Sequence, residues 1–207
     1  MDRKSKKRGN VLKDILNERL IPGTVFSPEK MGNVTGVDFL NKVFYISNGI
    51  MLSQIKEITG IDKTTLQNWV KRGWVSNPKK KLYDKEQVAR ILIINMTRET
   101  MQLSRVVYLL RYINGDSEED KIVSEEDLYD YVCKTCDMIF YSYSGGLRSI
   151  GDIVWEVLAD YEEKCGGAKM RLAAGVEAIS VIYCSTLLKR SADRFVDELG
   201  MNEKRKR

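Results

Sequence analysis

Five polar side chains of the types that contact nucleic-acid bases and phosphates lie within one short stretch of the sequence. They are Lys63, Thr64, Gln67, Asn68 and Lys71. Gln67 and Asn68 carry amides that can pair with adenine through two hydrogen bonds each. Helical spacing would place the five side chains on one face, with Leu66, Trp69 and Val70 on the opposite, buried face. The stretch therefore predicts a helix with a base-reading surface.

A second short helix precedes this one. Leu52, Ile55 and Ile58 have the apolar spacing of an amphipathic helix. Gly60 can end that helix in the left-handed conformation, and Asp62 is a good N-cap for the helix that follows. Two short helices joined by a glycine turn form a helix-turn-helix, whose second helix enters the major groove of DNA. We expect residues 62–72 to be that recognition helix.

Residues 74–83 predict a small β-hairpin, or wing. Trp74 and Val75 would form one strand, Leu82 and Tyr83 the other, and Asn77-Pro78 marks a turn between them. The three lysines 79–81 would then lie at the tip, within reach of a phosphate backbone; the plain alternative is a solvated lysine-rich loop. The residues predicted to bind DNA are Lys63, Thr64, Thr65, Gln67, Asn68, Lys71, Arg72, Lys79, Lys80, Lys81 and Tyr83.

The charge of this region supports an anionic partner. Residues 49–85 contain eight lysines and arginines against three acidic residues, although the whole chain has a formal net charge of only +5. A local basic excess beside a helix-turn-helix is typical of proteins that bind phosphates. The alternative hypothesis is a protein-interaction module that uses the same basic face on an acidic protein partner.

The order of these features resembles the MerR-type winged helix-turn-helix. The matching residues are Leu52-Ser53-Gln54-Ile55, Gly60-Ile61, Thr64-Thr65-Leu66, Lys71-Arg72-Gly73, Tyr83-Asp84, Val88 and Leu103-Ser104. More narrowly, residues 21–131 resemble an uncharacterised bacterial family of MerR-like regulators that is known only as a domain of unknown function. The resemblance implies a DNA-binding transcriptional regulator. Gln67-Asn68-Trp69 and Pro78-Lys79 depart from the usual MerR sequences, so no target sequence can be carried over.

Catalytic and metal chemistry receive little support. Histidine is absent, which removes the commonest general base and most zinc sites, so we expect no enzyme, cofactor or metal. Cys133 and Cys136 have the spacing of a zinc or redox pair, but they fall on the apolar face of a predicted helix, where buried structural cysteines are commoner. The glycine-rich segment 145–151 lacks the ending of a phosphate-binding loop and predicts an interhelical turn.

The chain predicts a mainly α protein: a winged helix-turn-helix followed by an all-helical C-terminal domain. A basic arm and short helix occupy 1–20, the DNA-binding domain 21–114, an acidic linker 115–123 and a helical dimerisation or effector domain 124–207. We expect helices at 37–46, 84–96, 103–113, 124–143 and 150–164, and one or two over 168–199.

The expected partners follow from this organisation. They are double-stranded DNA, a second copy of the chain, and an unidentified small-molecule effector. Two-fold dimers reading paired half-sites are the usual solution for such small modules. Four cysteines without a dense framework, and no apolar signal segment, predict a cytoplasmic protein with reduced thiols. No uninterrupted apolar run approaches the length of a membrane span, so no membrane contact is expected.

Overall fold

The computed structural model describes residues 19–142 and 148–204, with side chains of the last helix up to residue 199. Its regular structure is mainly helical, which confirms the predicted fold class at that level. The N-terminal half contains a 3-10 helix η1 (Pro28–Met31), α2 (Gly36–Val43), β1 (Ile50–Met51), α3 (Leu52–Thr59), α4 (Lys63–Lys71) and β2 (Leu82–Tyr83). It is followed by α5 (Lys85–Thr97), α6 (Leu103–Asn114), α7 (Glu125–Ser142), α8 (Ile150–Val157) and α9 (Ala168–Lys204). The short helix predicted within residues 1–20 falls outside the described residues except at residues 19 and 20, which are not helical.

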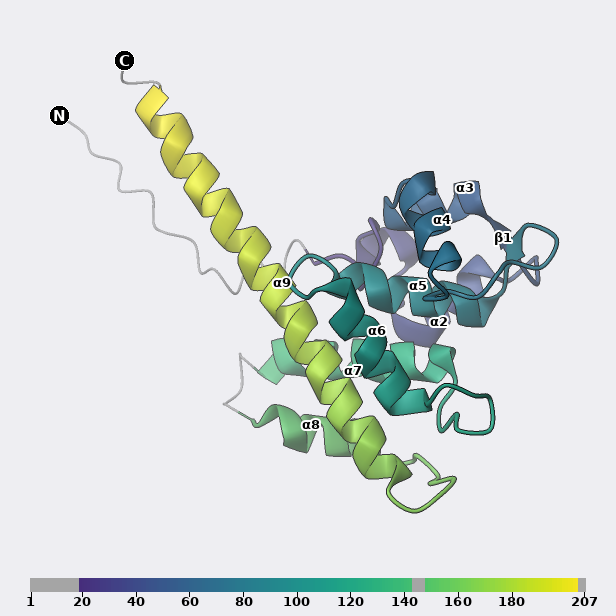
Figure 1. Ribbon diagram of the computed structural model, residues 1–207. Helices are drawn as coiled ribbons and strands as arrows, with labels where there is room; N and C mark the ends of the chain where they lie inside the picture. The colour runs from purple at the N-terminus through teal and green to yellow at the C-terminus, as the bar shows by residue number, and fades with distance from the viewer. Residues whose placement is uncertain (1–18, 143–147, 205–207) are drawn as a thin grey trace.

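Helix α5 is the centre of the molecule. Asp84 accepts a hydrogen bond from the Gln87 backbone N–H, and the Gln87 side chain accepts one from the Asp84 N–H, so the helix begins with a capping box. Almost every apolar side chain of α5 is buried, including the run from Ile91 to Ile94. Helix α7 packs against α2 and α5 on one side and against α8 and α9 on the other (Figure 1). Both halves of the chain therefore contribute to one contiguous core.

The sheet differs from the predicted hairpin. Strand β2 pairs antiparallel with β1, with Ile50 opposite Tyr83, whereas Trp74 and Val75 form no strand. Val75 is buried in the core, and the Trp74 carbonyl accepts a hydrogen bond of 2.6 Å from Arg90 Nε. Because the 74–75 segment is held by α5, it is not free to pair with β2. The predicted turn is nevertheless tight: Lys79 pairs with Leu82, and Lys80 and Lys81 have positive φ angles of 50° and 67°.

The C-terminal helices also refine the predicted boundaries. Helix α7 matches the expected span closely, with the Ser124 hydroxyl accepting from the Asp127 N–H at 2.9 Å. Helix α8 ends at Val157, well before the predicted residue 164. Residues 168–199 belong to one helix, not two. The glycine at position 175 allows α6 to pack closely against α9. A Cβ at this position would lie only 2.4 Å from the Ile113 side chain.

The predicted acidic linker forms a loop between α6 and α7. Residues 116–120 are exposed, whereas Ile122 and Val123 are buried and belong to the common core. The domain boundaries themselves stay a prediction.

Helix α9 extends away from the rest of the protein at its C-terminal end (Figure 1). By length and composition, its portion Ala168–Leu199 is apolar enough to cross a membrane, but half of the qualifying window is buried within the protein. A core helix of a soluble protein meets the same criterion, so this feature alone is weak evidence for a membrane span.

Candidate nucleic-acid interface

The start of α4 is fixed by its N-cap. Helix α3 ends at Thr59, and Gly60 takes a left-handed conformation with φ of 70°, as predicted. Asp62 then accepts two hydrogen bonds from Thr65, one from the backbone N–H at 2.9 Å and one from the hydroxyl at 2.6 Å. These bonds lower the pKa of the Asp62 carboxyl, so it remains an ionised cap. The Thr65 hydroxyl is thereby directed at Asp62 rather than at a partner.

Helix α4 separates its apolar and polar side chains as the sequence predicts. Leu66 and Trp69 are almost fully buried, and Val70 is half-buried. The exposed side chains of α4 and its C-cap are Lys63, Thr64, Gln67, Asn68, Lys71 and Arg72. The polar surface of α4 is therefore accessible along its whole length, while Trp69 anchors the helix to the core.

The lysine turn lies beside the two-stranded sheet. Lys79, Lys80 and Lys81 are all exposed. Tyr83 is different, because its side chain is only 4% exposed and burial raises the pKa of its phenol. We expected Tyr83 among the phosphate contacts; the structure places it in the core, since its alternating position in β2 points inward. We therefore leave Tyr83 out of the candidate interface.

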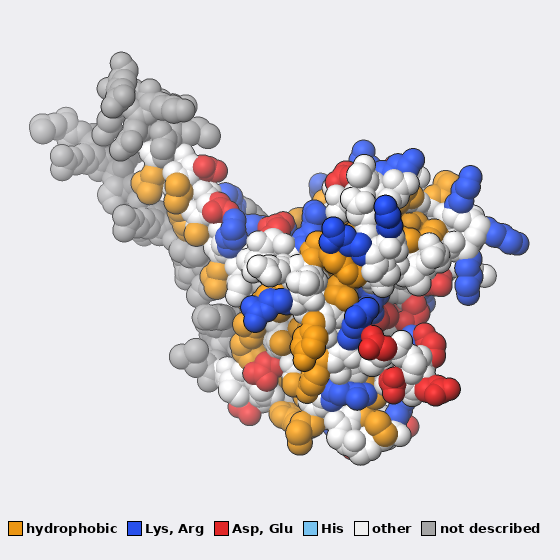
Figure 2. Space-filling model, in the orientation of Figure 1, with side chains coloured by type: hydrophobic (Ala, Val, Ile, Leu, Met, Phe, Trp, Pro, Cys, Tyr) orange, Lys and Arg blue, Asp and Glu red, His pale blue; other side chains and the backbone are white. Residues whose placement is uncertain are grey.

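We use the name basic face for six exposed cationic residues of α4, its C-cap and the lysine turn: Lys63, Lys71, Arg72, Lys79, Lys80 and Lys81. Within residues 19–142 and 148–204, none of the six belongs to a salt bridge. Arg72 instead lies over the Trp74 ring, 5.0 Å from its centroid. Lysine and arginine side chains gather over α3, α4 and the adjoining turn in Figure 2, and acidic side chains gather below them.

Three other cations in this half of the protein are paired with carboxylates. Lys85 pairs with Glu126 at 3.1 Å, and Lys121 pairs with Glu86 at 3.0 Å. Arg90 pairs with the buried Glu125. The contrast matters because only cations without a carboxylate partner are ready to neutralise phosphates. The basic face is thus electrostatically distinct from the cations at the start of α5 and in the α6–α7 loop.

One cationic residue near the interface could not be predicted from the sequence. Arg98, at the C-cap of α5, places its guanidinium 6.0 Å from the centroid of the Trp69 ring. The two residues are 29 positions apart in sequence, and the tertiary fold brings them together. Arg98 is exposed, so it adds a further cation beside α4.

The predicted cysteine pair is buried on α7, which confirms its placement on the apolar face. Cys133 and Cys136 have almost no exposed surface, and burial raises the pKa of the Cys133 thiol far above its ordinary value. A thiol so disfavoured as thiolate is a poor nucleophile and metal ligand. In the part of the chain that the structure describes, no three histidine, cysteine or acidic residues are grouped to hold a metal ion.

Comparison with known proteins gives one match. Residues 37–132 match a domain of unknown function, DUF1836. No curated protein matches the chain, and no solved structure matches it. The matched segment begins within α2 and ends within α7, so it includes α3, α4, the sheet and α5. The segment that matches DUF1836 carries every residue of the basic face.

Proposed function

We propose that this protein is a sequence-specific DNA-binding transcriptional regulator whose α3–α4 unit is a MerR-like winged helix-turn-helix. The observation that carries the proposal is the basic face: six exposed cations, none paired with a carboxylate among the described residues, lie around the exposed amides of Gln67 and Asn68 on α4. Amides suit base edges and unpaired cations suit phosphates. Helix α4 would lie in the major groove, with the lysine turn as a wing on the phosphate backbone.

The fixed start of α4 supports base reading. Asp62 holds the first turn through Thr65, and Trp69 holds the middle against the core, so the exposed amides are displayed on a rigid helix. Side chains on a rigid element lose little freedom when they pair with a base, which favours specificity.

The double variant Gln67→Ala/Asn68→Ala tests whether α4 reads bases. We expect it to lose at least about tenfold of the preference for the cognate duplex over a scrambled one, because one bidentate amide–adenine pair discriminates by about 1–3 kcal/mol. Fluorescence anisotropy with duplexes from the DNA upstream of the gene, or from a random-pool selection, measures this preference. Ser53→Ala, an exposed change on α3, is the matched control. An unchanged preference in the double variant would contradict base reading by α4.

We also propose a homodimer formed through α9. Four exposed apolar residues, Val181, Leu188, Phe195 and Leu199, are spaced seven, seven and four apart on this helix. That spacing is typical of a coiled-coil seam. All eight side chains from Ala192 to Leu199 are exposed, so the outer part of α9 is not covered by the described residues. A second α9 packed along the same stripe would bury it and place two α4 helices on paired half-sites.

The variant Leu188→Glu/Phe195→Glu tests the dimer. Sedimentation at tens of micromolar should show a dimer for the wild type and a monomer for the variant, because the seam would then bring like charges together. Ile46→Glu, which changes an exposed apolar residue of the α2–β1 loop, should remain dimeric. A monomeric wild type at this concentration would count against the α9 seam.

A further inference from the structure

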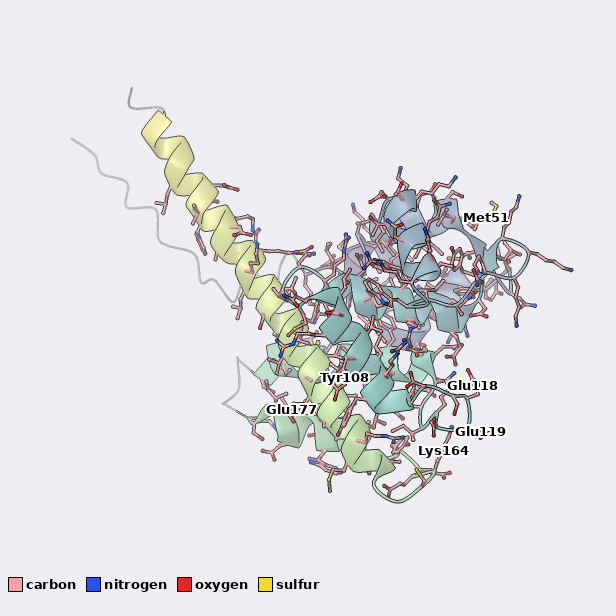
Figure 3. All side chains as sticks on the ribbon, viewed as in Figure 1. Met51, Tyr108, Glu118, Glu119, Lys164 and Glu177 are labelled. Carbon is pink, nitrogen blue, oxygen red and sulfur yellow. The ribbon has the colours of Figure 1, made fainter. Side chains whose placement is uncertain are left out.

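Two helices that pack along each other, α7 and α9, both carry a cysteine in the region of their contact. Cys136 belongs to α7 and Cys184 to α9. Cys184 lies about two turns after the exposed Glu177, which Figure 3 labels on α9. Cys136 is 1% exposed, whereas Cys184 is only half-buried. Both are free thiols, so the two helices offer one buried and one accessible sulfur.

The two thiols face each other between the helices. Cys136 and Cys184 share a hydrogen bond between their side chains. The side chain of Ser180, four residues before Cys184, also lies beside the Cys136 thiol. Residues four apart occupy the same face of a helix, so one face of α9 brings Ser180 and Cys184 onto Cys136. Sulfur atoms in hydrogen-bonding contact need only a small movement to form a disulfide bond of about 2 Å.

The other two cysteines are less suited to pair with Cys136. Cys133 and Cys136 are three residues apart on α7, which separates their Cβ atoms by about 5–6 Å, whereas a disulfide needs about 3.5–4.5 Å. The Cys133 thiol instead interacts with the Tyr129 hydroxyl and with the backbone of Gly36 at the start of α2. Cys165 is exposed in the loop between α8 and α9. The pair Cys136 and Cys184 is therefore the one that the packing prepares.

The hydrogen bond makes the two thiols chemically unequal. Because Cys136 donates to the Cys184 sulfur, the bond lowers the pKa of Cys184. The same bond, together with burial, raises the pKa of the Cys136 thiol well above its ordinary value. The thiolate, and not the thiol, is the nucleophile that attacks an oxidant. Cys184 is therefore the sulfur that reacts first, since it is both the more readily ionised and the more accessible of the two.

We propose that Cys184 and Cys136 form a redox-sensitive pair, which a hydroperoxide converts into a disulfide that joins α9 to α7. The Cys184 sulfur attacks an oxygen of the hydroperoxide, the O–O bond breaks, and Cys184 becomes a sulfenic acid. The other oxygen leaves with the former thiol proton, as an alcohol or, from hydrogen peroxide, as water. The Cys136 sulfur then attacks the Cys184 sulfur, and the S–O bond breaks. The hydroxide leaves with the Cys136 proton as a second water, so two thiols have given two electrons to one peroxide.

The disulfide would connect positions that are 48 residues apart in the sequence. A cross-link between distant positions restricts the unfolded chain and thereby stabilises the folded state. A thiol reductant reverses the bond by exchange, which makes the modification suitable for sensing an oxidant in a reducing compartment. Neither DNA nor a second copy of the chain takes part in this reaction.

Mapping of disulfides in the folded full chain after treatment with a small excess of hydrogen peroxide tests the pairing. Trypsin places the four cysteines on four different peptides, because lysines or arginines separate all of them in the sequence. Mass spectrometry without reductant should find peptide 135–148 joined to peptide 172–189 as the main cross-link, with the loss of two hydrogen atoms. The midpoint of thermal unfolding should rise by at least about 3 °C on oxidation and return with dithiothreitol.

Variants of each cysteine provide the matched controls. Cys184→Ala and Cys136→Ala should both lose the cross-link and the thermal shift, whereas Cys133→Ala and Cys165→Ala should keep them. The wild-type map needs no variant, so a substitution that impairs folding does not decide the outcome. Peroxide-treated protein in which all four cysteines stay reduced, or are oxidised without this cross-link, would overturn the proposal. So would a cross-link that forms equally well in urea-unfolded protein, because the packing of α9 on α7 would then play no part.

Discussion

Replacing Lys79, Lys80 and Lys81 together by alanine is expected to flatten the salt dependence of duplex binding. Each neutralised phosphate contributes a slope of about −0.9 to the plot of log affinity against log salt, so the loss of three contacts makes the slope less negative by about 2.7. Between 50 and 200 mM salt, the wild type should then lose about 40-fold more affinity than the variant. Anisotropy titrations at four salt concentrations measure both slopes.

Paired cations provide the control for this result. Lys85 and Lys121 lie in the same half of the protein but are bound to Glu126 and Glu86. Lys85→Ala/Lys121→Ala should therefore keep the wild-type slope, even though it removes nearly as much charge. Equal flattening by both variants would show that only net charge matters, and the basic face would lose its special role.

Replacing Trp69 by alanine should cost about 3–5 kcal/mol of unfolding free energy, the usual cost of removing a large buried aromatic side chain. Trp69 is 2% exposed and packs α4 onto the core, with Arg98 over its ring. Urea unfolding followed by circular dichroism measures the change. Helix α4 would lose its anchor, so duplex affinity should also fall.

Trp155 is the matched control for Trp69. It lies on α8 and is 49% exposed, with Lys169 over its ring at 6.0 Å. Its replacement by alanine should cost much less unfolding free energy than that of Trp69, about 1 kcal/mol, because about half of its surface is exposed to solvent. Similar losses for both tryptophans would contradict the assignment of Trp69 as the anchor of α4.

Local signals in the sequence predicted most of the helices correctly. The caps at Asp62, Asp84 and Ser124 rest on hydrogen bonds between residues three apart, so they can be read without knowledge of the fold. Apolar spacing likewise placed Leu66 and Trp69 inside and Gln67 and Asn68 outside. The predicted DNA contacts along α4 depend on this local spacing and are exposed, apart from Thr65, whose hydroxyl binds Asp62.

The errors come from contacts that are distant in sequence. The partner of β2 is β1, more than 30 residues earlier, and the burial of Tyr83 follows from that pairing. The nearer candidate strand at Trp74 was excluded by Arg90, whose side chain binds its carbonyl. Turn residues in the sequence cannot show which of two segments, 74–75 or β1, pairs with β2.

The most direct test of the central claim is a competition experiment on the basic face. A fluorescent duplex bound to the wild-type protein is titrated with unlabelled duplex of the same sequence, or with polyglutamate at equal charge concentration, at 150 mM salt. Our account predicts displacement by the duplex at concentrations at least about 100-fold below those of polyglutamate, because α4 fits a major groove as well as neutralising charge. Equal displacement by the two polyanions would contradict DNA recognition and would assign the basic face to an acidic protein partner.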